Sequence, residues 1–447
     1  MVQADPIIHV PIRARCDAPA GKGDSVDFDD SPEEAEFRAE VRAWLKQHAE
    51  PRRSGQLAQL DPQARFERAR RLLTAKGAKG YSAITWPKEL GGLGGTEIQN
   101  LIFLQEQAQF DIDTLHGSDF FAVGLELCGG TIMRCGTEEQ RRRFIAPLLR
   151  GEEIWCQLFS EPACGSDLAA VRTRAVRDGA DWLVTGQKVW TTGGHFSDYG
   201  LALTRTDPAV PKHQGLTMFI IDMKQPGVEV RPIRQMSGEA EFNEVFLDDV
   251  RVLDSFRVGP VGGGWKVALT TLGQERSTAA GLSFVEWQQL LALAQNTMMN
   301  GQPAIDDGRI LERLAECWLN NFGVRLLSYR NQTALTRGAV PGPQESMAKL
   351  IITQQGQRSA ITALDMLGTL GSLSPTILGE QWSPIEHAWY WSPAFRIAGG
   401  TDEILRNILA ERVLGLPAEA RVDREVPFNQ LQSRAAASTP SNPQLHS

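Results

Sequence analysis

The sequence predicts an α+β chain in which a helical domain, a small β-barrel or sandwich, and a helical bundle follow one another. Apolar residues recur at helical spacing up to about residue 151, and the same spacing returns from Gly262 onward. Short β-rich runs fill the chain between them, and a length of 447 residues suits about three domains. We therefore expect a flexible leader (1–27), an N-terminal helical domain (28–151), a middle β domain (152–258), a C-terminal helical bundle (259–417) and a flexible tail (418–447).

The N-terminal domain opens with a helix-start signal. Ser31 and Glu34 have the spacing of a capping box, and Pro32 occupies the first helical position. The apolar residues that then recur at helical spacing are Phe37, Val41, Trp44 and Leu45. Further helices are expected over residues 96–109 and 138–149, with a glycine-rich loop at 91–95.

The middle domain contains a hairpin signal at Asp178-Gly179, because this pair suits a tight turn between strands. The runs expected to form strands are 183–185, 187–191, 216–223, 228–233 and 244–252. The helices expected in the C-terminal part span about 265–300, 309–337, 343–368 and 402–414. Long helices joined by short Gly/Pro breaks favour an antiparallel bundle.

Composition excludes several classes of function. The net charge is −8, which argues against a nucleic-acid backbone as the main partner. The six cysteines form no CxxC pair, so we expect free thiols, a cytoplasmic location and no metal site. No apolar run reaches the roughly 18 residues of a membrane span, and residues 1–25 lack the apolar block of a signal peptide. The chain also lacks a P-loop, a GxGxxG fingerprint, HExxH and a GxSxG elbow.

Three segments have unusual local chemistry. Residues 159–167 (FSEPACGSD) combine hydroxyls, small residues and turn formers, residues 187–194 (QKVWTTGG) set a Trp beside two hydroxyls, and residues 399–404 (GGTDEI) place glycines before a helix start. Backbone amides at such loops and helix starts suit an anionic or flat aromatic ligand. Taken singly, a capped surface turn and a core Trp explain the first two segments equally simply.

In this order, and within an α–β–α chain, the three segments resemble the acyl-CoA dehydrogenase family. The residues 160–167 resemble its TEPxAGSD loop, with Ser160 for Thr and Cys164 for Ala. Further matches are WPKELGGLG at 86–94, GTEEQ at 136–140, PLLRGE at 147–152 and VFLDDVRV at 245–252. The resemblance covers roughly residues 28–417 and implies the fold of the family, with a four-helix bundle at the C-terminal end.

The resemblance also implies a chemistry: FAD-dependent dehydrogenation of an acyl-CoA thioester to the trans-2-enoyl-CoA. The α-proton goes to a carboxylate, the β-hydrogen goes to flavin N5 as hydride, and the electrons pass to an electron-transfer flavoprotein. The residues carried over as cofactor-binding are Phe159, Ser160, Trp190, Thr191, Thr192, Thr401 and Glu403, and those carried over as substrate-binding are Ser166, Arg276 and Gly399.

The chain departs from the family at the catalytic base. Most members carry a Glu immediately before the Gly-Thr pair of the final motif, where this chain has Gly399, which keeps only its backbone N–H donor. A second base position, known in the isovaleryl and long-chain subgroups, matches Glu275 of the run LGQER at residues 272–276. We predict Glu275 as the base, and the alternative is that Glu275 and Arg276 form a polar pair on a helix surface.

Two FAD-binding motifs of the family are also eroded. No RxxFG segment follows Gly281, and QxxGGxG is altered to the sequence DMLGTLG at residues 365–371. Both hold the adenosine diphosphate half of FAD across a subunit interface, so we expect a homo- or hetero-oligomer, as in members that act on steroid side chains. An oxygen-using acyl-CoA oxidase and a non-catalytic partner subunit remain alternatives, and the fatty-acid or steroid nature of the acyl group stays open.

Overall fold

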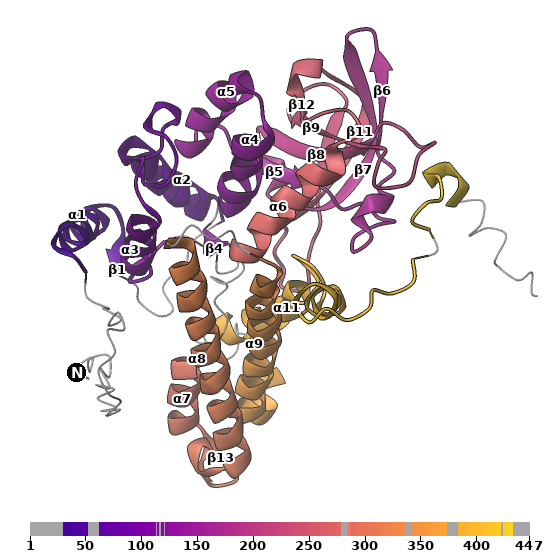
Figure 1. The fold of residues 1–447 in the computed structure, drawn as a ribbon. Helices are drawn as coiled ribbons and strands as arrows, with labels where there is room; N and C mark the ends of the chain where they lie inside the picture. Colours follow the sequence, from indigo (N-terminus) through magenta and orange to yellow (C-terminus); the bar gives the residue numbers. More distant parts are fainter. Residues whose placement is uncertain are drawn as a thin grey trace, which may run out of the picture.

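The computed structural model describes residues 30–51, 62–112, 114–115, 118–119, 121–278, 285, 287–336, 342–372, 383–421 and 423–431. Figure 1 shows a helical part and a β sheet side by side, with a bundle of long helices projecting below them. The expected leader (1–27) and the residues after 431 lie outside the described residues. Among the described helices, none combines the length and the apolar character needed to cross a bilayer.

The N-terminal part is helical, as predicted. Its helices are α1 (Pro32–His48), α2 (Pro62–Lys79), α3 (Glu97–Gln107), the π-helical η3 (Val123–Gly129), α4 (Gly130–Cys135) and α5 (Glu138–Leu149). The capping box predicted at Ser31 is confirmed, and Thr96 and Thr137 form two more. The short strands are β1 (Glu50–Pro51), β2 (Phe110–Asp111), β3 (Thr114–Leu115) and β4 (Ser118–Asp119).

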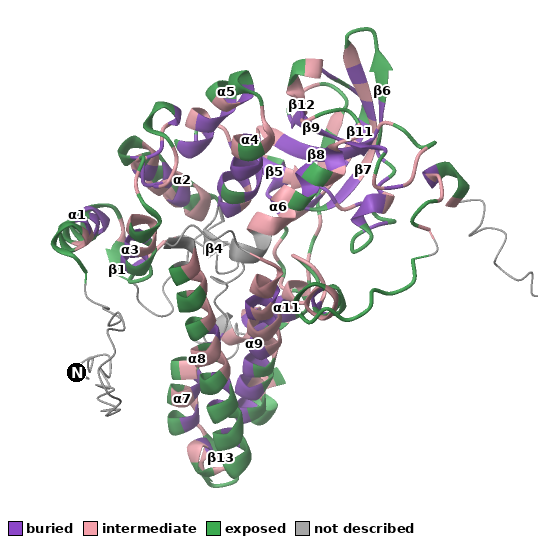
Figure 2. Cartoon of the chain, in the orientation of Figure 1, coloured by how far each residue is buried: buried purple, intermediate pink, exposed green. Residues whose placement is uncertain are grey.

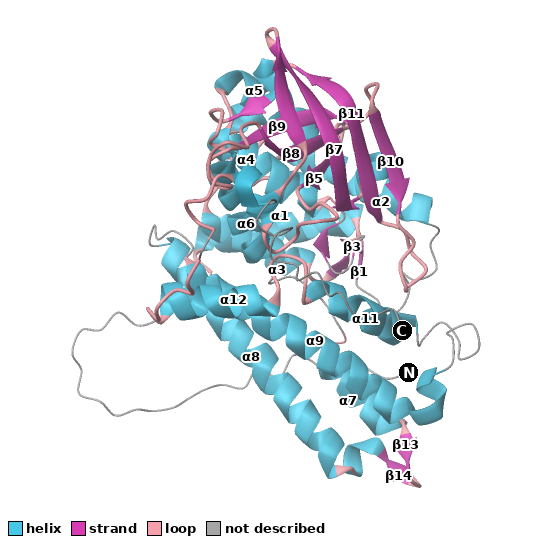
Figure 3. Ribbon diagram, turned by 90° about the vertical axis from the view of Figure 1, so that its right-hand side faces the viewer, coloured by secondary structure: helices cyan, strands magenta, loops and turns pink. Residues whose placement is uncertain are grey.

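The middle part is an eight-stranded sheet in the order β10-β11-β7-β6-β8-β9-β12, with β5 beside β8. The strands are β5 (Trp155–Leu158), β6 (Arg174–Asp178), β7 (Asp181–Thr192), β8 (Tyr199–Arg205), β9 (Leu216–Asp222), β10 (Val228–Pro232), β11 (Phe242–Val252) and β12 (Arg257–Val258). Asp178 pairs with Asp181, which confirms the hairpin predicted at Asp178-Gly179. Figure 3 shows the long strands running side by side toward the bundle.

The C-terminal part contains α6 (Gly264–Thr278), α7 (Trp287–Asn296), α8 (Gly308–Thr336), α9 (Ser346–Leu367), α11 (Ser383–Phe395) and α12 (Asp402–Ile408). The predicted helix over 265–300 is wrong at its end, where β13 (Met298–Met299) and β14 (Gln302–Pro303) form a hairpin. Asn300 and Gly301 both adopt positive φ, at 51° and 85°, and this turn geometry stops a helix. The sequence also gave no sign of α11.

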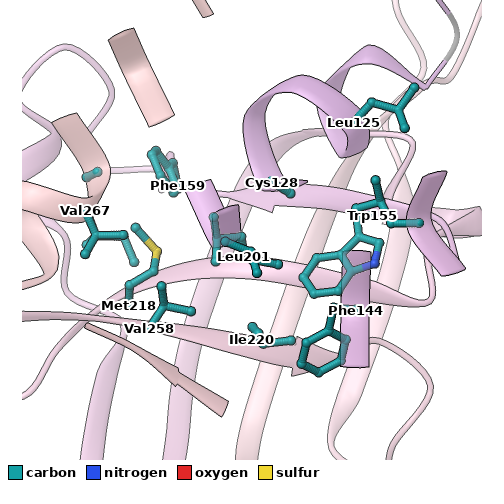
Figure 4. Close-up of a cluster of buried hydrophobic side chains, with 14 of the residues drawn as sticks. Leu125, Cys128, Phe144, Trp155, Phe159, Leu201, Met218, Ile220, Val258 and Val267 are labelled. Atoms are coloured by element: carbon teal, nitrogen blue, oxygen red, sulfur yellow. The ribbon is translucent and has the colours of Figure 1, made fainter. Parts of the chain in front are cut away.

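One apolar core joins the first two parts of the molecule. Leu125 and Cys128 of η3 and Phe144 of α5 pack with Trp155 and Leu201 of the sheet (Figure 4). Val267 of α6 belongs to the same cluster, whereas the helices α7, α8, α9 and α11 bury a separate core. Burial in Figure 2 follows this division, since the buried surfaces line the sheet and the inner faces of the helices. The position of α6 is therefore set by the sheet.

The tail differs from the flexible segment expected from residue 418. Residues 415–421 are exposed, but the chain then returns to the middle domain, where Pro427 pairs with Pro211. Phe428 is only 7% exposed there. The prediction relied on the polar composition of the tail, whereas Phe428 and backbone hydrogen bonds hold this short segment against the middle domain.

Candidate active site

The loop at residues 159–167 is anchored by a buried ion pair. Lys188 of β7 is fully buried, and its Nζ donates to Glu161 Oε1 at 2.8 Å and to two backbone carbonyls. Glu161 also accepts from the backbone amides of Arg172 at 2.6 Å and Thr173 at 2.9 Å. Burial raises the pKa of Glu161, but the Lys188 ammonium and these hydrogen bonds outweigh it, so the pKa lies below its ordinary value. These contacts therefore anchor the loop at Glu161.

The predicted cofactor residues of this loop meet the end of β7 directly. Ser160 accepts a backbone hydrogen bond from Val189 at 2.9 Å, and Phe159 is buried in the shared core. Ser166 lies farther along the loop and is exposed. The structure thus brings the first two segments singled out in the sequence together at one edge of the sheet.

The end of β7 is strained. Trp190 has a φ of 60° and is 58% exposed, with its ring edge-on to Phe242 at a centroid distance of 5.8 Å. Positive φ in a bulky residue costs of order 1–3 kcal/mol and is typical of functional positions. Thr191 follows, and its buried Oγ1 has no hydrogen-bond partner within the described part of the chain. Thr192 ends the strand half-buried.

Asn243 of β11 holds this strand end and was missed by the sequence analysis. Its Nδ2 donates to the carbonyls of Thr191 at 2.9 Å and Glu241 at 2.8 Å. Its Oδ1 lies 3.0 Å from His195 Nδ1 and therefore accepts from that nitrogen. A single Asn in a β-rich run carries little signal, because its importance depends on the register between β11 and β7.

The third segment forms a turn before α12. Gly399 and Gly400 adopt φ values of 68° and 99°, and Thr401 caps α12 by accepting from the Ile404 amide at 3.3 Å. Residues other than glycine rarely adopt a backbone φ in this region. The turn therefore suits Gly399 better than it would suit a glutamate. Glu403 lies exposed on the first turn of α12.

Polar side chains of α9, together with Arg396 just after α11, fix this turn. Asp402 is buried and pairs with Arg396, whose Nε lies 2.9 Å from Asp402 Oδ2, and Gln354 donates to the same oxygen at 3.0 Å. Lys349 Nζ donates to the Gly400 carbonyl at 2.7 Å. Burial raises the pKa of Asp402, but Arg396 outweighs it and holds the pKa below its ordinary value. Asp402 Oδ1 is buried without a partner among the described residues. The sequence analysis missed these partners, since Gln354 and Lys349 lie 48 and 51 residues from the groups they bind.

The predicted base lies in the last turn of α6. The backbone of Glu275 and Arg276 is helical, and their side chains lie outside the described residues. The rotation of α6 is fixed one turn earlier, where Thr271 Oγ1 lies 2.8 Å from Thr131 Oγ1 of α4. Gln274 packs so closely on Gly130 that a Cβ there would lie 1.7 Å from Gln274 Oε1.

The two halves of the site meet through the loop between β10 and β11. Glu239 accepts from Trp391 Nε1 of α11 at 2.7 Å and lies 2.9 Å from His387 Nε2. The Phe242 ring, which contacts Trp190, also packs against Trp391 at a centroid distance of 5.3 Å. The helix that precedes the turn at 399–402 is therefore docked on the β domain beside the strained strand end.

Comparison with known proteins identifies this architecture. Profiles of the N-terminal, middle and C-terminal domains of acyl-CoA dehydrogenases match residues 31–152, 156–250 and 262–414. The chain belongs to the acyl-CoA dehydrogenase family. It is therefore an oxidoreductase with the α+β fold of that family, as the sequence resemblance implied.

Curated acyl-CoA dehydrogenases resemble the chain over most of its length. Acyl-CoA dehydrogenase IpdE1 of Mycobacterium tuberculosis is 37% identical over 398 residues, covering 86% of this chain and 98% of that protein. Acyl-CoA dehydrogenase FadE34 of the same organism is 38% identical, covering 76% of this chain and 45% of that protein.

Solved structures share the fold. A structure described as the Tcur3481-Tcur3483 steroid ACAD has a TM-score of 0.71 and 28% identity, covering 88% of this chain and all of that chain. The ChsE4-ChsE5 complex from Mycobacterium tuberculosis gives a TM-score of 0.69 and 28% identity with the same coverage. The first is named for a steroid, and the second is described as a complex of two proteins.

Proposed function

We propose that this acyl-CoA dehydrogenase binds FAD and converts an acyl-CoA thioester to the trans-2-enoyl-CoA, with Glu275 as the base. The observation that carries the proposal is the strand end at Trp190 and Thr191. An exposed, strained Trp stands there, directly against the loop of Ser160. Beside it lies a buried hydroxyl that has no hydrogen-bond partner among the described residues. An aromatic face next to an unused hydrogen-bonding group suits a flat heteroaromatic ring.

The residues present fit a flavin. Phe159, Ser160, Trp190, Thr191 and Thr192 would contact the ring from the β domain, and Thr401 and Glu403 would contact the cofactor from α12. FAD, when bound, supplies the acceptor at N5 for the β-hydrogen of the substrate. The Glu161–Lys188 pair and Asn243 keep the binding groups in place before the cofactor arrives.

The substrate is handled by the remaining residues. Glu275 takes the α-proton, and the Gly399 amide donates to the thioester oxygen, where negative charge develops. Ser166 and Arg276 would contact the acyl-CoA substrate. Support for Glu275 comes from the turn at Gly399, whose positive φ disfavours a glutamate at the position used by most of the family.

The acyl group is proposed to be a steroid side chain, or another bulky chain. Gly399 leaves room where most members carry a glutamate, and a similar solved structure is described as a steroid ACAD. The electrons then pass to an electron-transfer flavoprotein in the cytoplasm.

We also propose that the chain works as an oligomer. The helix α8 carries exposed apolar side chains at Leu311, Trp318, Leu319, Leu326 and Tyr329. An apolar stripe of this length on one helix is typical of a subunit interface. A partner there would also supply the contacts to the adenosine diphosphate half of FAD that the eroded motifs no longer encode.

An anaerobic titration tests the reaction. Steroid-side-chain CoA thioesters should bleach the flavin band of the purified holoenzyme, and straight-chain thioesters should do so less completely. Glu275→Gln should lower kcat/KM about 10²- to 10⁴-fold while FAD stays bound, since this is the usual contribution of a general base. Glu316→Gln, which alters an exposed ion pair on α8 with Arg358, is the matched control. Unchanged kcat/KM in Glu275→Gln would contradict the assignment of the base.

A further inference from the structure

The end of the described chain is fastened to the middle domain by main-chain contacts. The amide of Phe428 donates to the Val210 carbonyl at 2.9 Å, and the amide of Asn429 donates to the Pro208 carbonyl at 2.9 Å. In Figure 1 this segment is the yellow turn beside the sheet, reached by a long extended connection from α12. Since residues 415–421 are exposed, the segment is held by its own contacts and not by the connection.

A buried arginine links the tail to the residues that follow the loop at 159–167. The Arg205 guanidinium lies 3.6 Å from the centroid of the Phe428 ring. The same group donates to the carbonyls of Ala169 at 2.6 Å and Val171 at 3.0 Å, which follow the loop at 159–167. Phe428 therefore covers Arg205, which binds the backbone directly after this loop.

Lys212 makes the most direct link. Its Nζ donates to both oxygens of Asp167 at 2.9 and 2.8 Å, and it lies 2.6 Å from Asp423 Oδ2 in the tail. The Lys212 side chain is 9% exposed, so its ammonium depends on these two carboxylates for compensation. Asp167 is the last residue of the loop and directly follows Ser166.

The loop is thus held at two points. Glu161 and Cys164 exchange backbone hydrogen bonds at 2.9 and 3.0 Å, and the Lys188 pair fixes this first end. The second end is fixed by Lys212. Between them lies Gly165, around which a Cβ would meet no atom within 4 Å. The position of Ser166 accordingly depends on the contact between Asp167 and Lys212.

We propose that residues 423–431 form a strap that fixes the substrate-binding loop, with Lys212 as its positioning residue. The strap holds the Lys212 ammonium against Asp167 and keeps Arg205 on the carbonyls that follow the loop. Loss of the strap frees the second end of the loop, and Ser166 then no longer meets the thioester in one position. The role of Ser166 comes from the proposed function, whereas the stiffening of the loop does not depend on it.

Hydrogen exchange of the full-length, ligand-free protein tests the stiffening. Asp423→Asn and Phe428→Ala should each speed the exchange of amides in residues 162–171 about threefold or more. The first variant removes a carboxylate that holds Lys212, and the second removes the ring that covers Arg205. Asp423→Glu should restore slow exchange, since it keeps the carboxylate. Asp365→Asn, which breaks an exposed ion pair with Arg313 on the bundle, is the charge-matched control and should leave the loop unchanged. Equal exchange in wild type, Asp423→Asn and Phe428→Ala would overturn the strap.

A binding measurement then tests the consequence for the substrate. Calorimetry with a 3-thia acyl-CoA, which is not oxidised, should give an approximately threefold weaker Kd for Asp423→Asn than for the Asp365→Asn control. In turnover the change should appear in KM with kcat unchanged. Faster loop exchange with an unchanged Kd would overturn the link between the strap and the substrate. If the wild-type protein bound no acyl-CoA analogue, the proposed function would fail, and the exchange experiment would still decide whether the strap exists.

Discussion

The two halves of the active site are built in different ways. The half on the β domain is held within the chain by buried polar pairs, including Lys188 with Glu161 and the hydrogen bonds of Asn243. The half on the helices is held by a turn with two glycines at positive φ and by hydrogen bonds from Lys349 and Gln354 of α9, and the neighbouring helix α8 presents an apolar stripe to the solvent. The contacts of one half are thus buried within the chain, whereas the other half lies beside an exposed apolar surface.

The largest effect is expected from breaking the β-domain half. Lys188→Met removes a fully buried cation and leaves Glu161 unpaired, which should lower the free energy of unfolding by about 3–5 kcal/mol. Urea denaturation of the purified protein measures this change. Arg231→Ala, which breaks an exposed pair with Glu229, should change the free energy of unfolding by less than about 1 kcal/mol. Equal losses in both variants would show that the buried pair does not hold the loop.

The second prediction concerns the helical half and its vacant base position. In the double variant Gly399→Glu with Glu275→Gln, a carboxyl returns to the position used by most of the family, but at a backbone φ of 68°. We expect kcat/KM to remain at least about 100-fold below wild type, since the new side chain is held away from a productive geometry. Steady-state kinetics measures this, and Gly399→Ala with Glu275→Gln controls for backbone strain. Recovery to within tenfold of wild type would show that this turn accepts a base.

A smaller effect should reveal the strain at the junction of the two halves. Trp190→Gly should be more stable to urea than Trp190→Ala by about 1 kcal/mol, because glycine adopts a φ of 60° without penalty. Both variants should bind FAD more weakly than wild type. If the alanine variant were as stable as the glycine variant, the positive φ at Trp190 would not be a source of strain.

The smallest effect should be a dependence of stability on pH. Burial lowers the pKa of His195, so the unfolded chain binds a proton more readily than the folded chain in the range just below the ordinary pKa of 6.5. The contribution of His195 to stability is therefore present above pH 6.5 and falls as the pH drops below it. His195→Gln should flatten this slope in urea denaturation between pH 5 and 7. Identical slopes in the two proteins would show that a group other than His195 causes the pH dependence of stability.

Much of the fold could be predicted because its signals are local. The capping box at Ser31, the hairpin at Asp178-Gly179 and the change from helical to alternating patterns each depend on residues within a few positions of one another. The helix boundary near Asn300 was predicted wrongly, since a tight turn there interrupts an otherwise helical pattern. Helix α11 begins after residues that gave no regular spacing.

The site could be predicted only in part. Its three segments were recognised in the sequence, and two of them meet through Ser160 and Val189. The residues that fix them were missed, because Asn243, Lys349 and Lys212 act on partners far along the chain. No local pattern indicates such pairs, since they arise from strand register and helix packing. The role of Glu275 as the base remains a prediction.

The shared core has a consequence for how the molecule comes apart. Because Val267 and Ala268 pack with the sheet and the N-terminal helices, α6 belongs energetically to those parts, although its sequence belongs to the C-terminal domain. The remaining long helices bury their own cluster. Heating should then melt two cooperative blocks, and α6 should melt with the sheet and the N-terminal helices. The proposed proton acceptor, Glu275, would thus belong to the block that holds the flavin-side strand end, although its sequence belongs to the C-terminal domain.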